Sequence, residues 1–140
     1  MASVQENIIN DVVTRLNAAT FTAALTASKR LFPRFKLENI TATIVDVYPG
    51  PVEYVKQDRA GNYLKGYEIR LVLLSPLTAD TNAALSPFLV LSEEIKNDLA
   101  GRNMAGLPLS QIDSDEFLNF ELVQTAGLVS IEINLTYQGI

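Results

Sequence analysis

The spacing of apolar residues near the N-terminus is that of one face of a helix. Four of them repeat at i, i+3, i+4 and i+7: Ile9, Val12, Val13 and Leu16. Ser3 followed by Glu6 matches a capping box, in which the two side chains satisfy free backbone N–H groups at the start of a helix. We therefore predict a helix from about Ser3 to Asn17, with an apolar stripe that a sheet must cover.

Four later segments have the character of strands. Residues 128–138 give the cleanest pattern, because apolar and polar side chains alternate from Val129 to the end of the segment. Residues 40–48 are rich in β-branched side chains, and residues 67–74 alternate in the same way. Residues 21–29 also alternate, but their three alanines suit a helix as well, and we favour a strand.

A second helix is predicted in the middle of the chain. Ser86 can cap it, Pro87 suits the first helical position, and the helix should end near Ala100, before Gly101. The expected buried face consists of four residues: Phe88, Leu91, Ile95 and Leu99. Four others should face water: Glu93, Glu94, Lys96 and Asn97.

A polar connection separates this helix from the last strand. Asp113, Asp115 and Glu116 lie in it, without the spacing and the turn glycine of a calcium loop. We interpret the three carboxylates as the cap and first turn of a short helix that starts near Phe117. Residues 119–125 add an apolar-polar stretch that leaves the topology of the C-terminal part open.

Together these elements predict an α+β fold. The chain of 140 residues has the length of one domain, so we expect a single domain over residues 1–140. Both helices can cover the apolar face of the sheet. The prediction is a two-layer sandwich of about four mostly antiparallel strands, with two helices on one face and a long β-hairpin.

Two parts of this sheet are candidates for function. The connection of residues 49–66 is longer than an ordinary hairpin loop, so it is either a projecting β-arm or a mobile loop. The polar sheet face carries Glu68, Arg70, Glu132 and Asn134, and no predicted helix covers it. That face either meets solvent or lines a cavity or interface made with other subunits.

The residue types exclude much catalytic chemistry. The chain has no histidine and no cysteine, so the usual general base, thiolate nucleophile and cysteine metal ligands are missing. No glycine motif that cradles phosphates is present either. We expect no enzymatic activity, no cofactor and no metal. An enzyme that uses Asp, Glu, Lys or Tyr, and a monomeric ligand-binding domain, remain as alternatives.

The net charge of −5 is unevenly distributed. Residues 1–70 carry 9 basic and 7 acidic side chains, whereas residues 71–140 carry 2 and 9. Such a chain has little affinity for a phosphate backbone, but it suits head-to-tail pairing of copies; a merely solubilising role for the charges is equally open. The N-terminus lacks the pattern of a signal peptide, and no apolar run reaches the length of a membrane span, so we expect a soluble protein made in the cytoplasm.

Four segments carry a further likeness: residues 33–40 (PRFKLENI), 45–49 (VDVYP), 93–95 (EEI) and 133–137 (INLTY). Together with the order of the elements, they resemble bacteriophage tail terminator and tail-completion proteins. The likeness extends over nearly the whole chain, and its motifs are packing patterns.

The resemblance implies a structural virion protein of the tail or neck that is assembled in the host cytoplasm. A ring of such subunits, commonly six, caps the tail tube, ends its elongation and joins the tail to the head. DNA passes through the ring without being specifically bound. The partners would be further copies of the chain, the tail tube protein and a neck or head-completion protein. Another connector component, such as a head-completion or tube subunit, is an alternative.

In such a ring the long hairpin is the expected contact with a neighbour, the tube or the neck. Five of its residues are predicted interface residues, because aromatic and cationic side chains are suited to interface contacts: Tyr54, Lys56, Arg59, Tyr63 and Lys65. The polar sheet face would then line the lumen.

Overall fold

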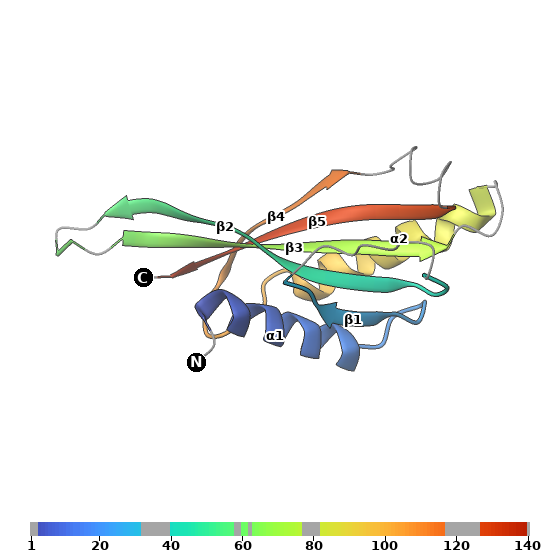
Figure 1. Cartoon of the computed structure of the whole chain (residues 1–140), viewed down its shortest axis with the longest axis horizontal. Helices are drawn as coiled ribbons and strands as arrows, with labels where there is room; N and C mark the ends of the chain where they lie inside the picture. The colour runs from blue at the N-terminus through green and yellow to red at the C-terminus, as the bar shows by residue number, and fades with distance from the viewer. Residues whose placement is uncertain are drawn as a thin grey trace.

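The computed structural model describes residues 3–31, 40–57, 60–61, 63–76, 82–116 and 127–139. Within them, two helices and five strands follow in this order (Figure 1): α1 (Val4–Ala18), β1 (Thr26–Lys29), β2 (Ile44–Gln57), β3 (Tyr63–Pro76), α2 (Asn82–Leu99), β4 (Leu109–Glu116) and β5 (Leu128–Gly139). The strands form one sheet in the order β1-β2-β3-β5-β4. β1 is parallel to β2, and the other neighbours are antiparallel. The predicted α+β sandwich is confirmed, with five strands where about four were expected.

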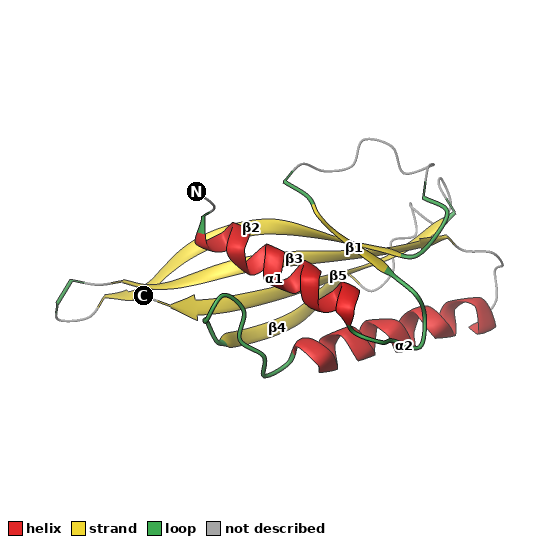
Figure 2. Ribbon diagram, turned by 90° about the horizontal axis from the view of Figure 1, so that it is seen from below, coloured by secondary structure: helices red, strands yellow, loops and turns green. Residues whose placement is uncertain are grey.

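Both helices lie on the same face of the sheet, as predicted (Figure 2). The register aligns apolar residues of three strands under them: Val47 pairs with Leu71, which pairs with Ile133. These side chains are buried. The helices contribute eight buried residues to the same core: Ile8, Ile9, Val12, Leu16, Phe88, Leu91, Ile95 and Leu99. The predicted buried face of α2 is confirmed in full, and Val13 of α1 is only partly buried.

The start of α1 follows the predicted cap. The Ser3 side chain accepts a hydrogen bond of 3.1 Å from the Glu6 backbone N–H, and this bond satisfies one free donor of the first turn. The carboxylate of Glu6 lies 3.6 Å from the Lys29 ammonium group on β1. The first turn of the helix is therefore also linked to the edge of the sheet.

The predicted start of α2 is wrong by one turn. The helix begins at Asn82, and Pro87 lies inside it. Residues 83–85 (AAL) are strong helix formers, which favours an additional turn before the proline. Pro87 has no N–H to donate to the carbonyl of residue 83, and its ring crowds that carbonyl. Only the first turn of the helix precedes it, so few backbone hydrogen bonds are affected.

The strand predicted over residues 21–29 is much shorter in the structure, where β1 begins at Thr26. Phe21, Ala23 and Leu25 still pack against the core without being part of a strand. The Asn17 side chain donates to the Ala27 carbonyl (3.0 Å) and accepts from the Ala27 N–H (2.9 Å). Asn17 thus takes the place of a neighbouring strand at the outer edge of β1.

The interpretation of residues 113–116 as a helix cap is wrong, because they belong to the edge strand β4. A register shift between Leu109 and Gln111 adds one residue to β4. It places Leu109 opposite Tyr137 and Ile112 opposite Leu135, so both apolar residues lie on the core side although they are three positions apart. The expectations for residues 117 and 119–125 lie outside the described residues.

Ion pairs and hydrogen bonds join the two helices and the segment between α1 and β1. Arg15 of α1 makes two hydrogen bonds to Asp98 of α2, at 2.9 and 2.6 Å. This contact holds the pKa of Asp98 below its ordinary value, and Asp98 in turn raises the pKa of Arg15. Glu94, expected to face water, accepts a hydrogen bond of 3.1 Å from the Thr22 backbone N–H.

Candidate functional site

The described residues of the 49–66 segment form a projecting β-arm, one of the two alternatives predicted from the sequence. Strands β2 and β3 continue to pair up to Gln57 and Tyr63. The pairing of β3 with β5 ends earlier, at Lys65 and Gly139. Beyond that point the arm is a two-stranded ribbon that extends past the rest of the sheet (Figure 1).

The root of the arm is held by α1. The β2–β3 register shifts between Pro49 and Val52, because β2 has one residue more than β3 there and forms a bulge. The side-chain amide of Gln5 donates to the Gly50 carbonyl (2.6 Å) and to the Glu68 carbonyl (2.8 Å), one on each strand. A Cβ at Gly50 would lie 3.0 Å from the Glu68 side chain, so the close approach of the strands suits a glycine. The arm therefore leaves the body in a defined direction.

Three of the five predicted interface residues meet on the arm. The rings of Tyr54 and Tyr63 pack edge to face with centroids 5.4 Å apart, and the Lys65 ammonium group lies 5.6 Å from the Tyr54 ring centroid. Tyr54 is 63% exposed, Tyr63 is 45% exposed and Val52 is 38% exposed. We call Val52, Tyr54, Tyr63 and Lys65 the arm cluster. The Lys56 side chain and Arg59 lie outside the described residues.

The structure also brings the predicted polar-face residues together. The Arg70 guanidinium lies 3.2 Å from the carboxylate of Glu68 and 3.8 Å from that of Glu132, and Arg70 is opposite Asn134 in the β3–β5 register. Arg70 and Glu68 come from one strand, and Glu132 and Asn134 come from its neighbour. At this point of the sheet face opposite the helices, the Arg70 guanidinium therefore lies between two carboxylates.

Sequence reasoning missed a buried carboxylate on that same face. Asp46 of β2 is fully buried, 3.9 Å from the Arg30 guanidinium and 3.4 Å from the Tyr48 hydroxyl, which donates to it. Leu74 and Leu128 are also buried there. The segment Val45-Asp46-Val47 gives no signal of this burial, because an acidic residue at an alternate strand position ordinarily indicates a solvent-exposed face.

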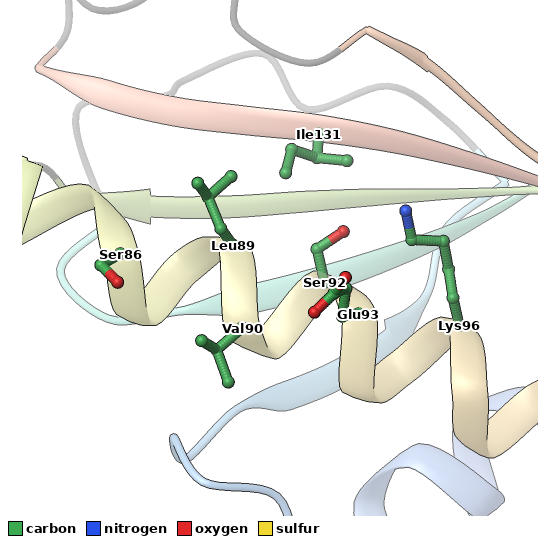
Figure 3. A pocket seen from close by; sticks show the side chains of 7 residues that line it. All are labelled: Ser86, Leu89, Val90, Ser92, Glu93, Lys96 and Ile131. Atoms are coloured by element: carbon green, nitrogen blue, oxygen red, sulfur yellow. The ribbon is translucent and has the colours of Figure 1, made fainter.

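A groove runs between α2 and β5. Its cavity volume is about 340 Å³. Seven residues line it (Figure 3): Ser86, Leu89, Val90, Ser92, Glu93, Lys96 and Ile131. Leu89 and Ser92 point from the helix towards the strand that carries Ile131 (Figure 3). The lining of this α2–β5 groove is mostly apolar, from Leu89, Val90 and Ile131, with two serines and the charged Glu93 and Lys96 beside them. Val90 is 42% exposed and Glu93 is exposed.

The described residues hold no group of three or more His, Cys, Asp or Glu side chains that could bind a metal ion. The Tyr137 hydroxyl is buried without a hydrogen-bond partner among the described residues, and burial raises its pKa, so the phenol remains protonated at neutral pH. Among the described helices, none has both the length and the apolar character required to span a membrane.

The fold and surfaces define an α+β sandwich with a projecting arm, a charged sheet face and an apolar groove. No family model matches the sequence, and no curated protein matches it.

Solved structures do match the fold. A chain of the virion of a native gene transfer agent particle is 14% identical, with a TM-score of 0.54 over 99% of this chain and 98% of that one. A second solved chain is 12% identical, with a TM-score of 0.51 over 96% of this chain and 92% of that one. A sheath/tube terminator of an extracellular contractile injection system reaches a TM-score of 0.40 at 17% identity, which does not establish a shared fold. The first two similarities establish a shared fold at low identity.

Proposed function

We propose that this chain is a structural subunit of a phage-tail-like particle. In this proposal, copies of the chain form a ring, six in number, that caps the tail tube, ends its elongation and joins the tail to the head or neck. The ring contacts the tail tube protein on one side and a neck protein on the other. It catalyses no reaction.

The observation that carries this proposal is the fold shared with a virion chain, in which nearly the full length of both chains is aligned. At 14% identity the sequences have diverged, while the arrangement of helices and strands is retained. The order of elements and the four sequence segments that resemble tail terminators support the same class of protein. Because one fold can host many functions, the proposal depends also on the surfaces of this chain.

The arm provides the first of these surfaces. A two-stranded ribbon is marginally stable alone, yet this one displays an aromatic pair and a lysine to solvent. Tyrosines of this kind are concentrated where protein interfaces gain their energy. We therefore assign interface roles to Tyr54, Lys56, Arg59, Tyr63 and Lys65. Tyr54 is the most exposed of the large hydrophobic residues that the structure describes.

The polar sheet face provides the second surface. Glu68 and Glu132 flank Arg70, and Asn134 lies opposite it, so the cation is already engaged by carboxylates. Arg30 also lies beside a carboxylate, that of Asp46. A channel wall built from the described residues of this face would therefore present cations that are already paired, and DNA would pass without being held. We place this face towards the lumen of the ring.

The solution mass of the purified protein tests the proposal. Light scattering at low and high concentration and at two salt levels, with negative-stain images of the same sample, should give a closed ring of about six subunits with a central opening. A chain that stays monomeric throughout, and that also fails to bind the ends of tail tubes, contradicts the proposal. A ring that binds the head end but not the tube supports the alternative of a head-completion subunit.

A further inference from the structure

We infer that the arm cluster of one copy docks in the α2–β5 groove of a second copy. This contact deepens the proposed function, because it names the two surfaces through which subunits meet. It rests on the proposed association of copies and on no feature of the tube or the neck.

The two surfaces are complementary in shape and polarity. The arm cluster lies on the projecting arm and exposes two aromatic rings, with Tyr54 as its most exposed member. The groove is concave, with Leu89, Val90 and Ile131 in its lining. Its volume of about 340 Å³ lies at the small end of the roughly 300–1,000 Å³ range of binding pockets, which suits inserted side chains.

The charges are complementary as well. Residues 49–66, the arm, carry three basic and two acidic side chains, whereas α2 carries three acidic and one basic. Of the acidic side chains on α2, Asp98 is engaged by Arg15, and Glu93 is exposed and lines the groove. Lys65, beside the tyrosines, would then lie near Glu93 of the neighbour.

The geometry requires two copies. The arm extends away from α2 at one end of the molecule (Figure 1), so it does not fill the groove of its own chain. The contact joins two different surfaces, which makes it heterologous. A repeated heterologous contact forms a ring where its rotation returns to the first copy, and an open filament where it does not. The proposed assembly corresponds to the closed case.

Cysteine crosslinking tests the contact directly, because the natural sequence contains no cysteine. Three single variants are needed: Val52→Cys on the arm, Glu93→Cys at the groove and Asp113→Cys on the exposed edge strand β4. The Val52→Cys and Glu93→Cys substitutions each replace one residue of the proposed contact, but they keep both tyrosines, Lys65 and the apolar groove residues. All three positions are exposed. Purified variants are mixed in pairs at high concentration and treated with a short bismaleimide crosslinker.

We expect the mixture of Val52→Cys and Glu93→Cys to give a product of twice the chain mass. The same product should be lost when Glu93→Cys is replaced by Asp113→Cys, and when Tyr54→Ala and Tyr63→Ala are added to the arm variant. Equal crosslinking to Asp113→Cys, or a dominant product from Val52→Cys alone, would overturn the inference, since the arm would then meet β4 or another arm.

The failure of this inference and the failure of the proposed function give different results. If the wild-type protein forms a ring but the Val52–Glu93 product is absent, copies associate through other surfaces and only the docking inference is wrong. If neither a ring nor the crosslinked product forms, both are wrong.

Discussion

The body and the arm of this molecule are built from the same strand with the same alternation, but they bury their side chains differently. In the body, β3 lies between β2 and β5, and its residues Ile69, Leu71 and Leu73 are fully buried under the helices. In the arm, Tyr63 on the same side of β3 is 45% exposed, because β5 has ended and neither helix covers it. The body therefore stabilises the fold, whereas the arm presents aromatic side chains that are not buried within the chain.

The largest effect is expected from a truncation in the body. Ile133→Ala removes a fully buried side chain that lies opposite Leu71, and such a change costs about 2–5 kcal/mol through lost burial and the cavity left behind. Urea unfolding measures the change. Thr136→Ala on the polar face of the same strand is the matched control, with an expected cost under about 1 kcal/mol. Equal costs for the two variants would mean that the helix-covered face is not the core.

The pair of Arg15 and Asp98 should give a smaller effect that depends on pH. The pKa of Asp98 is held below its ordinary value of 3.8, chiefly by the hydrogen bonds from Arg15, so the charged form stabilises the folded state. That contribution is present above pH 3.8 and is lost as the pH falls through the folded-state pKa. Asp98→Asn should therefore be less stable than wild type at pH 7, and the difference should shrink in acid.

Urea unfolding of both proteins at neutral and acidic pH measures this difference. Asp113→Asn provides the control, because Asp113 is an exposed carboxylate that accepts a hydrogen bond from the side-chain amide of Gln111 and not from an arginine. A difference for Asp98→Asn that stays constant down to the lowest pH would show that its charge does not contribute to stability.

At the junction of body and arm, Gln5→Ala should cost about 1 kcal/mol, since it removes two partly exposed hydrogen bonds that each contribute roughly 0.5–1.5 kcal/mol. The same substitution should also loosen the root of the arm. Amide hydrogen exchange of residues 50–54 should become faster, while exchange in β5 should change little. Gln111→Ala on β4 is the matched control. Faster exchange throughout the sheet would show that Gln5 supports the body and not the arm root.

The smallest effect on stability is expected in the arm itself. Tyr54→Ala combined with Tyr63→Ala removes one edge-to-face aromatic pair. Such pairs contribute about 0.5–1.5 kcal/mol to stability. We expect a loss at the low end of this range, because both rings are exposed. Unfolding should be measured at high dilution, because association raises the apparent stability of the wild type by mass action. A loss of stability as large as that of Ile133→Ala would place the tyrosines in the core.

The sequence predicted the body of the fold well, because its signals are local and periodic. The alternation from Val129 to Gln138 identified β5, and the spacing of Phe88, Leu91, Ile95 and Leu99 identified the buried face of α2. It did not predict β4, because the register shift after Leu109 breaks the period of two on which strand prediction depends. The turn of α2 before Pro87 was missed because proline is expected at the first helical position.

The candidate site was predicted in part. Tyr54, Tyr63 and Lys65 were identified by residue type, and the structure adds that they touch one another. The α2–β5 groove and the burial of Asp46 depend on how segments far apart in the sequence come together, and no local pattern encodes this. Leu89 and Ile131, for example, line the same groove from two different elements. Sequence periodicity predicts which face of an element is buried but not where two elements leave a gap.

The central claim is that the arm serves association while the body serves stability. Its most direct test compares wild type with the Tyr54→Ala and Tyr63→Ala double variant, by measuring the mass of each in solution by light scattering and its unfolding midpoint at high dilution. The predicted result is a smaller assembly for the variant with nearly the same midpoint. A variant that keeps the wild-type mass but unfolds at much lower denaturant concentration would contradict the claim.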